Sequence, residues 1–192
     1  MELEEIIKFV KSKLSEKRFN HCIGVMNMCE KLAKIYGTDI ERAQKIGVTH
    51  DMAKEMTHEE DLEYMKENGI KLTDEEKGMP YLFHGYVAAD IAKKELGFDD
   101  EMCEAIKHHT TSKPNMTILQ KILYVADKVE EGRTYSDVNF YRNLAYTDID
   151  ECIIKILDYQ ISEDINNEMT IPSISCASRN YIINNRNSIS NA

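Results

Sequence analysis

Apolar residues recur along this chain at spacings of three and four, the period of an amphipathic helix, and not at the spacing of two that a strand shows. This pattern predicts a short helix after Ser175 and eight longer ones. The eight lie near residues 2–15, 18–36, 39–54, 58–68, 82–96, 100–109, 117–131 and 147–163. Because no alternating pair of segments is found, the sequence predicts an all-α fold, a bundle of about eight helices.

Residues that typically begin or end helices support the same division of the chain into helices. At four places a threonine is followed three residues later by Glu or Gln, the pattern of a capping box in which two backbone N–H groups are satisfied. These threonines are Thr38, Thr57, Thr73 and Thr117. Glycines of the kind that ends helices stand at Gly37, Gly69, Gly97 and Gly132.

Composition narrows the class of protein. A length of 192 residues with three prolines and eight glycines fits one domain without long linkers, and the polar end, NNRNSISNA, is expected to fray. The net charge of −10 argues against general nucleic-acid binding. No run approaches the roughly 20 apolar residues of a membrane span, and the acidic start is not a signal peptide. Five scattered cysteines predict reduced thiols in a cytoplasmic protein.

Three histidines lie on the apolar faces of their own predicted helices. His21, His50 and His84 each have apolar residues three or four positions away, and again seven positions away. A single histidine so placed is more often a hydrogen-bonded core residue than a metal ligand. Three on separate helices favour a metal, because every buried imidazole needs a polar partner and one ion satisfies several.

The remaining histidines are separated by the same helical count. In KHHTTSKPN, His109 follows Ala105 on an apolar face, whereas His108 follows Glu104 on an acidic face. His109 is therefore predicted to point inward and His108 to be solvated. His58 lies in the acidic first turn of a helix and is predicted to be exposed.

Two aspartates fall beside these histidines. Asp51 directly follows His50, and Asp127 lies within the apolar ILYVADKV. An unpaired carboxylate in such surroundings is costly, and a cation removes the cost. Imidazole with carboxylate suits iron, zinc, manganese or nickel, while the lack of cysteine pairs argues against structural zinc.

The ordered set of His21, His50-Asp51, His84, His109 and Asp127 resembles the HD-domain metal-dependent phosphohydrolases. Longer stretches are similar to the YqeK-type bacterial symmetrical bis(5′-nucleosyl)-tetraphosphatases, over about residues 15–183. They include RFNHCIGVMNMCEKLAKIYG, IGVTHDMAKEM, LFHGYVAADIAKKELG and AIKHHTTSKPNMTILQKILYVADKVEEGR. The chain departs from the family pattern at Glu131, Ile171 and Cys176, where that family often has proline, histidine and an acidic residue.

The resemblance implies a single HD phosphohydrolase domain over residues 1–192, with a core at about 15–165 and a tail, 166–192, that packs near the site. It implies an iron centre and the cleavage of diadenosine tetraphosphate into two ADP. One metal would be held by His21, His50, Asp51 and Asp127. His84 and His109 would complete a second site that Asp51 bridges, so Asp51, His84 and His109 are the expected catalytic residues. A metal-bound water or hydroxide would attack phosphorus.

The resemblance also implies a substrate-binding set. Arg18 stands one turn before His21, Lys54 stands one turn after His50 and Asp51, and Arg133 follows Gly132 at the end of the Asp127 helix; cations there can position phosphate. The full expected set is Arg18, Asp51, Lys54, His84, His109, Thr110, Asp127, Arg133, Ile171, Pro172, Ser173 and Ile174.

Several alternatives stay open. Manganese and zinc suit the ligands as iron does, and one or two ions fit. The chain is expected to bind no nucleic acid and no membrane; whether it forms a homodimer is not decided. The second function is another HD phosphohydrolase, acting on nucleoside mono- or triphosphates. The third is a non-catalytic nucleotide-sensing helical module.

Overall fold

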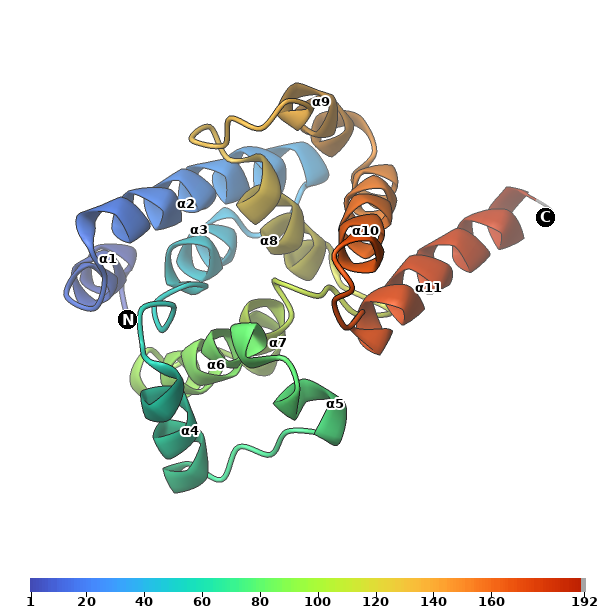
Figure 1. Ribbon diagram of the computed structural model, residues 1–192. Helices are drawn as coiled ribbons and strands as arrows, with labels where there is room; N and C mark the ends of the chain where they lie inside the picture. Colours follow the sequence, from blue (N-terminus) through green and yellow to red (C-terminus); the bar gives the residue numbers. More distant parts are fainter. Residues whose placement is uncertain (191–192) are drawn as a thin grey trace.

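The computed structural model describes residues 1–190, without the side chains of residues 187–190, and every regular element in that part of the chain is a helix (Figure 1). The all-α prediction is confirmed. The α-helices are α1 (Leu3–Lys11), α2 (Glu16–Tyr36), α3 (Ile40–Thr49), α4 (His58–Glu67), α5 (Asp74–Lys77), α6 (Phe83–Glu95), α7 (Asp100–Lys107), α8 (Ile118–Val129), α9 (Val138–Thr147), α10 (Ile149–Asn166) and α11 (Ser173–Ser190). A 3-10 helix, η1 (Pro80–Leu82), precedes α6.

The predicted number of about eight helices is too low, because helices that are short or have a weak apolar pattern are not detected by periodicity. Helix α5 has four residues, and α9, whose N-cap residue Asp137 makes no side-chain cap, is rich in aromatic and β-branched residues. Helix α11 has 18 residues, where the sequence predicted only a short helix after Ser175. The predicted fraying of the last residues falls on 191–192, outside the described residues, and on the end of α11.

Three of the four predicted capping boxes are present, at Thr57, Thr73 and Thr117. The fourth is wrong, because Asp39 and not Thr38 caps α3 and accepts the N–H of Arg42. The three glycines at the ends of α2, α4 and α6 adopt positive φ, as a helix stop requires. Gly132 is not such a stop, since α8 already ends at Val129 and the next residue is extended.

Helix α8 lies near the centre of the fold, and α2 packs against both α3 and α8 (Figure 1). Gly47 allows the close approach of α3, because a Cβ atom there would stand 2.8 Å from the Cα of Met26. Helices α6 and α7 pack on each other, and α7 also packs on α3 and α8. The core between them holds Leu32, Ile46 and Leu123, each fully buried. This packing brings one face of five helices together.

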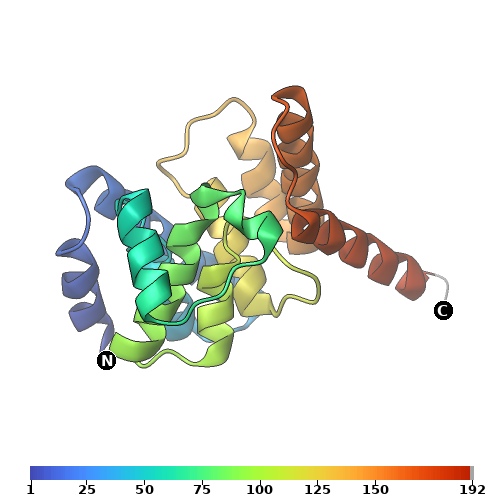
Figure 2. The same cartoon turned by 60° about the horizontal axis from the view of Figure 1, so that its bottom comes forward.

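The first turns of α11 join the turn after α7, the middle of the helix packs against α10, where Arg179 pairs with Asp158 and Arg186 with Glu151, and its end projects from the body (Figure 2). Ser175 donates to the carbonyl of Thr111, and the Ser178 hydroxyl lies 2.6 Å from that of Ser112. Ser112 itself has a φ of 63°, so the turn after α7 is tightly folded. The tail therefore docks directly behind the turn that carries His109.

All five cysteines are free thiols. Among the described residues, no helix combines the length and the apolar character that crossing a membrane requires.

Candidate metal centre

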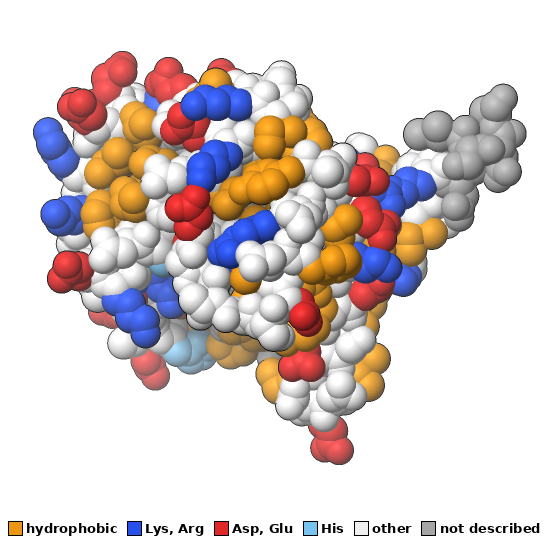
Figure 3. All heavy atoms as spheres, turned by 90° about the horizontal axis from the view of Figure 1, so that it is seen from above, with side chains coloured by type: hydrophobic (Ala, Val, Ile, Leu, Met, Phe, Trp, Pro, Cys, Tyr) orange, Lys and Arg blue, Asp and Glu red, His pale blue; other side chains and the backbone are white. Residues whose placement is uncertain are grey.

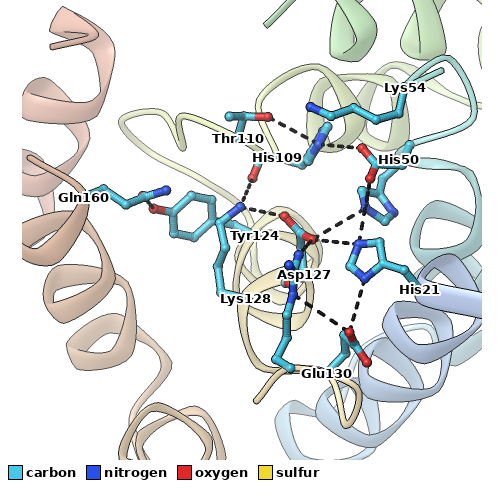
Figure 4. Close-up of polar contacts among 12 residues, drawn as sticks. His21, His50, Lys54, His109, Thr110, Tyr124, Asp127, Lys128, Glu130 and Gln160 are labelled. Atoms are coloured by element: carbon cyan, nitrogen blue, oxygen red, sulfur yellow. Dashed lines mark hydrogen bonds and ion pairs between the residues drawn. The ribbon is translucent and has the colours of Figure 1, made fainter. Parts of the chain in front are cut away.

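Six side chains that the sequence analysis selected converge between α2, α3, α6, α7 and α8. Four of them, His21, His50, His109 and Asp127, are labelled in Figure 4. The six come from the second turn of α2, the end of α3 and the turn after it, the start of α6, the turn after α7, and the last turns of α8. They are His21, His50, Asp51, His84, His109 and Asp127. All but His21 are less than 9% exposed, and the side chain of His21 is 12% exposed. The helical faces predicted for these residues are the faces observed.

The two carboxylates lie inside a ring of imidazoles. Asp127 Oδ1 is 3.1 Å from His21 Nε2 and 3.7 Å from His50 Nε2. Asp51 Oδ1 is 3.3 Å from His84 Nε2 and 3.4 Å from His109 Nε2, while its Oδ2 is 3.5 Å from His50 Nε2. Since its Oδ2 is also 3.8 Å from His21 Nε2, Asp51 faces all four histidines.

Hydrogen bonds from the Nδ1 atoms of His50 and His109 orient these two rings so that Nε2 points at the carboxylates. His50 Nδ1 donates to the carbonyl of Gly47 at 2.8 Å, and His109 Nδ1 donates to that of Ile106 at 2.6 Å. A neutral imidazole that donates from Nδ1 presents a lone pair at Nε2. Lone pairs then face carboxylate oxygens, and the buried Nε2 atoms of His21 and His50 make no hydrogen bond. Such an arrangement requires a cation, and a metal ion fits it.

The pKa values of the buried histidines and aspartates also show that the centre favours a positive charge. Burial alone would lower the pKa of His50, but Asp51 and Asp127 raise it to about 10. Burial would raise the pKa of Asp51, but the surrounding imidazoles hold it far below its usual range, and the pKa of Asp127 is lowered likewise by Lys128 and its histidine neighbours. Burial lowers the pKa of His84 to about 4. Two charged carboxylates therefore remain in the site at neutral pH.

Two overlapping groups have ligand atoms close enough to hold an ion. His21, His50 and Asp127 form the first, and His50, Asp51 and His109 form the second. His50 belongs to both. His84 belongs to neither, although its Nε2 is 3.2 Å from that of His109. Lys54 Nζ lies 3.3 and 3.4 Å from the two nitrogens of His84 and can donate only to an unprotonated one, while Asp51 Oδ1 lies 3.3 Å from Nε2.

Cations surround the centre as the sequence predicted. Arg18 Nη1 is 3.0 Å from Asp51 Oδ2, and Arg133 Nη2 is 2.8 Å from Asp127 Oδ1. Lys54 reaches His84, and burial lowers the pKa of its ammonium group. These groups can pair with the oxygens of a phosphate next to the ligands.

The expected substrate contacts beyond the centre fall into two places. Thr110 Oγ1 lies 3.3 Å from His109 Nε2, at the centre itself. Thr110 and Pro172 both line a cleft of about 260 Å³ with Tyr81, Tyr159 and Gln160, which we call the tyrosine cleft. Ser173 turns toward α5, where its N–H and hydroxyl donate to Glu75. Neither Ile171 nor Ile174 makes a hydrogen bond to a residue of the centre, and Ile174 lines a separate cavity.

The expectation for His58 is confirmed, and the one for His108 is wrong. His58 is exposed and stacks on the ring of Phe83, with centroids 5.4 Å apart. The His108 side chain is only 11% exposed. It lines a cavity of about 220 Å³ with Tyr86 and Pro172, because the returning tail covers the face that the helical count left to solvent.

Two further groups escaped the sequence analysis. Glu130 is 4% exposed and places Oε1 at 3.2 Å from His21 Nδ1, although it follows the last residue of α8. Gly24 leaves room for it, since a Cβ atom there would stand 2.5 Å from Glu130 Oε2. Lys128 pairs with Asp127 Oδ2 at 2.6 Å and reaches the carbonyl of His109 (Figure 4). The signal for both was their position beside Asp127 in ADKVEEGR.

The class of protein follows from this fold and from comparison with known families. The sequence model of the HD domain matches residues 18–132, a span that contains all six converging side chains. The chain belongs to the HD domain family.

Full-length relatives narrow the family further. The chain is 36% identical to the symmetrical bis(5′-nucleosyl)-tetraphosphatase of Bacillus subtilis over 158 residues, 81% of this chain and 83% of the relative. It is 33% identical to the enzyme of the same name from Staphylococcus aureus over 187 residues, 94% of both chains. Within the HD proteins, the chain belongs to the family of symmetrical bis(5′-nucleosyl)-tetraphosphatases.

A solved structure shares the whole architecture. The crystal structure of a protein from Clostridium acetobutylicum, described as a predicted HD superfamily hydrolase involved in NAD metabolism, matches with a TM-score of 0.92 at 34% identity. The match covers 96% of this chain and 98% of that one, so the tail as well as the helical body is shared.

Proposed function

We propose that this chain is a metal-dependent hydrolase that cleaves diadenosine tetraphosphate and related dinucleoside tetraphosphates symmetrically, giving two molecules of ADP. The observation that carries the proposal is the centre of facing imidazole and carboxylate groups, with three cations at its edge and full-length relatives of that name.

The metal ligands are proposed to be His21, His50, Asp51 and Asp127, with His109 supplying a second position through the group that shares His50. A bound metal ion polarises a phosphoryl oxygen and lowers the pKa of a coordinated water. Iron is the proposed metal, and manganese and zinc suit the same nitrogen and oxygen ligands. Because the two ligand groups share His50, the centre is proposed to bind either one ion or two.

The reaction is a displacement at phosphorus. The oxygen of a water molecule bonds to one of the two inner phosphorus atoms, the bridging P–O bond breaks, and one ADP leaves with the electron pair. The second ADP retains the oxygen of the water. His84 suits the exchange of the water's proton, because it is neutral at neutral pH and its Nε2 lies 3.3 Å from Asp51 Oδ1, inside the centre.

Positioning falls to the cations and the turn after α7. The planar guanidinium groups of Arg18 and Arg133 can each bind two phosphate oxygens, and Lys54 places a positive charge beside His84. The Thr110 hydroxyl lies where it can donate to phosphate. The tail at Ile171–Ile174 is proposed to border the nucleoside, through Pro172 in the tyrosine cleft.

The setting is proposed to be the cytoplasm, since five free thiols fit a reducing compartment. The single domain over residues 1–192 is likewise a proposal, which limited proteolysis tests. A homodimer is tested by the mass of the purified protein in solution.

Chromatography of the nucleotides released from diadenosine tetraphosphate tests the activity. ADP as the only product supports the proposal, and a mixture of ATP and AMP contradicts the symmetrical cut. Strong turnover of nucleoside mono- or triphosphates without tetraphosphate cleavage supports another HD phosphohydrolase activity instead. Asp51→Ala is the inactive control and His58→Ala the matched active one. If Asp51→Ala leaves metal content and ligand binding intact, a non-catalytic binding module is favoured.

A further inference from the structure

A symmetrical substrate has two nucleoside diphosphate halves, so the proposed function requires space for a nucleotide on each side of the bond that breaks. The tyrosine cleft opens at Thr110 and Gln160, and these residues lie on one side of the ligand cluster (Figure 4). Glu130 lies on the other side, beyond His21 (Figure 4). A second cavity opens there.

This cavity has a volume of about 650 Å³ and shares the wall of the metal centre. Its lining includes Lys17, Arg18, Asn20, His21, Glu130 and Arg133, and we call it the arginine groove. The space-filling view from above shows Lys and Arg side chains scattered over the surface among Asp and Glu side chains (Figure 3). His21, a proposed metal ligand, is part of the lining of the groove. The arginine groove is therefore directly adjacent to the proposed metal ligands.

The charges in the arginine groove favour an anion. Its two carboxylates are already engaged, since Glu55 accepts from the N–H and the hydroxyl of Ser15, and Glu130 contacts His21 and the N–H of Gly132. Lys17 and Asn20 are exposed and have no hydrogen-bond or ion-pair partner among the described residues. Free donors thus line the outer part of the groove, and two arginines line its inner part.

We infer that the arginine groove binds the second nucleoside diphosphate half of the substrate, the ADP that leaves. This inference rests on the proposed function. Arg18 and Arg133 hold the phosphates next to the centre, and Lys17 and Asn20 hold the outer phosphate and the ribose. The described lining has no Phe, Tyr or Trp side chain, whereas Tyr81 and Tyr159 line the opposite cleft. The leaving half is therefore bound without stacking of its base, and the base is selected mainly in the tyrosine cleft.

The test compares diadenosine tetraphosphate with adenosine 5′-tetraphosphate, which lacks the second nucleoside. In the double variant Lys17→Ala/Asn20→Ala, kcat/KM for the dinucleotide should fall about tenfold, and for the mononucleotide about twofold. Lys34→Ala, at the other end of α2 and paired with Glu30, is the control and should change neither value. Equal losses for both substrates, or no loss for the dinucleotide, overturn the inference. If wild-type protein releases no ADP from the dinucleotide, the proposed function fails instead.

A mixed substrate with one adenosine and one guanosine end tests the unequal selection of bases. In ¹⁸O-labelled water, the label enters only the nucleotide whose phosphorus is attacked. We expect most of the label in one of the two product nucleotides, because one half-site chooses the base. An even division between ADP and GDP contradicts the assignment of selection to one cleft.

Discussion

The carboxylate of Glu130 contacts the outer nitrogen of His21, with Oε1 3.2 Å from Nδ1, in a space that Gly24 leaves open. The N–H of Gly132 donates to the same carboxylate, so its position is fixed from two sides. The contact holds the His21 ring with Nε2 toward Asp127. A carboxylate behind a metal-binding imidazole orients the ring and increases its basicity as a ligand.

Replacing Glu130 should weaken metal binding without unfolding the protein. We expect Glu130→Gln to lower metal affinity about 10- to 100-fold, because the amide keeps the shape but loses the charge. Titration of the metal-free protein followed by elemental analysis measures this. Glu131→Gln is the matched control, since that neighbouring side chain is 75% exposed and pairs only with Lys31. Equal affinities for the two variants would remove Glu130 from the metal centre.

The adjacent histidines of KHHTT should differ strongly in their effect on turnover. His109→Ala removes an imidazole that lies 3.4 Å from Asp51 and is expected to lower kcat by at least about 100-fold. His108→Ala removes a ring that pairs with Glu104 and is expected to lower it by no more than about threefold. Steady-state kinetics on metal-loaded protein decide, with melting temperatures to verify folding. Similar losses in both variants would contradict the separation.

Helical periodicity was sufficient to find the four histidines and Asp127, because the apolar spacing continues to each of them, and Asp51 was found as the neighbour of His50. Periodicity could not find Glu130, whose contact with His21 depends on an extended residue after α8 and on the absence of a side chain at Gly24. It misplaced His108 for a related reason. The face of α7 that looks exposed by local count is covered by a tail more than 60 residues later in the chain, and no local pattern reports such a contact.

Stability should depend on pH through Asp61, outside the metal centre. Its buried Oδ1 has no hydrogen-bond partner in the described part of the chain, and burial raises the pKa of Asp61 to about 6. A carboxyl whose pKa is raised on folding stabilises the fold fully below its unfolded pKa of about 3.9, and this contribution is lost as pH rises through about 6. Asp61→Asn should therefore raise the melting temperature at pH 8 by about 2–4 °C, and have little effect at pH 4.

The matched control is Glu59→Gln, which removes an exposed charge from the same helical turn. It should leave the melting temperature nearly unchanged at both pH values. Scanning calorimetry of the two variants at pH 4 and pH 8 gives the comparison. If Asp61→Asn is equally stabilising at both, burial of a charged carboxylate at Asp61 is not the cause.

Metal removal should destabilise the fold, because the centre would then bury two charged carboxylates without their cation. With metal at 1,000 times its dissociation constant, binding adds about 4 kcal/mol to the free energy of unfolding, a rise in melting temperature of about 10 °C. His50 belongs to both ligand groups, so His50→Ala should abolish this rise whether one ion binds or two. His109→Ala, which disrupts only the second group, should keep part of it, and His58→Ala should keep all of it. Melting curves with chelator and with added iron, manganese or zinc measure each difference. A wild-type protein that melts at one temperature under all of these conditions would contradict a metal at this centre.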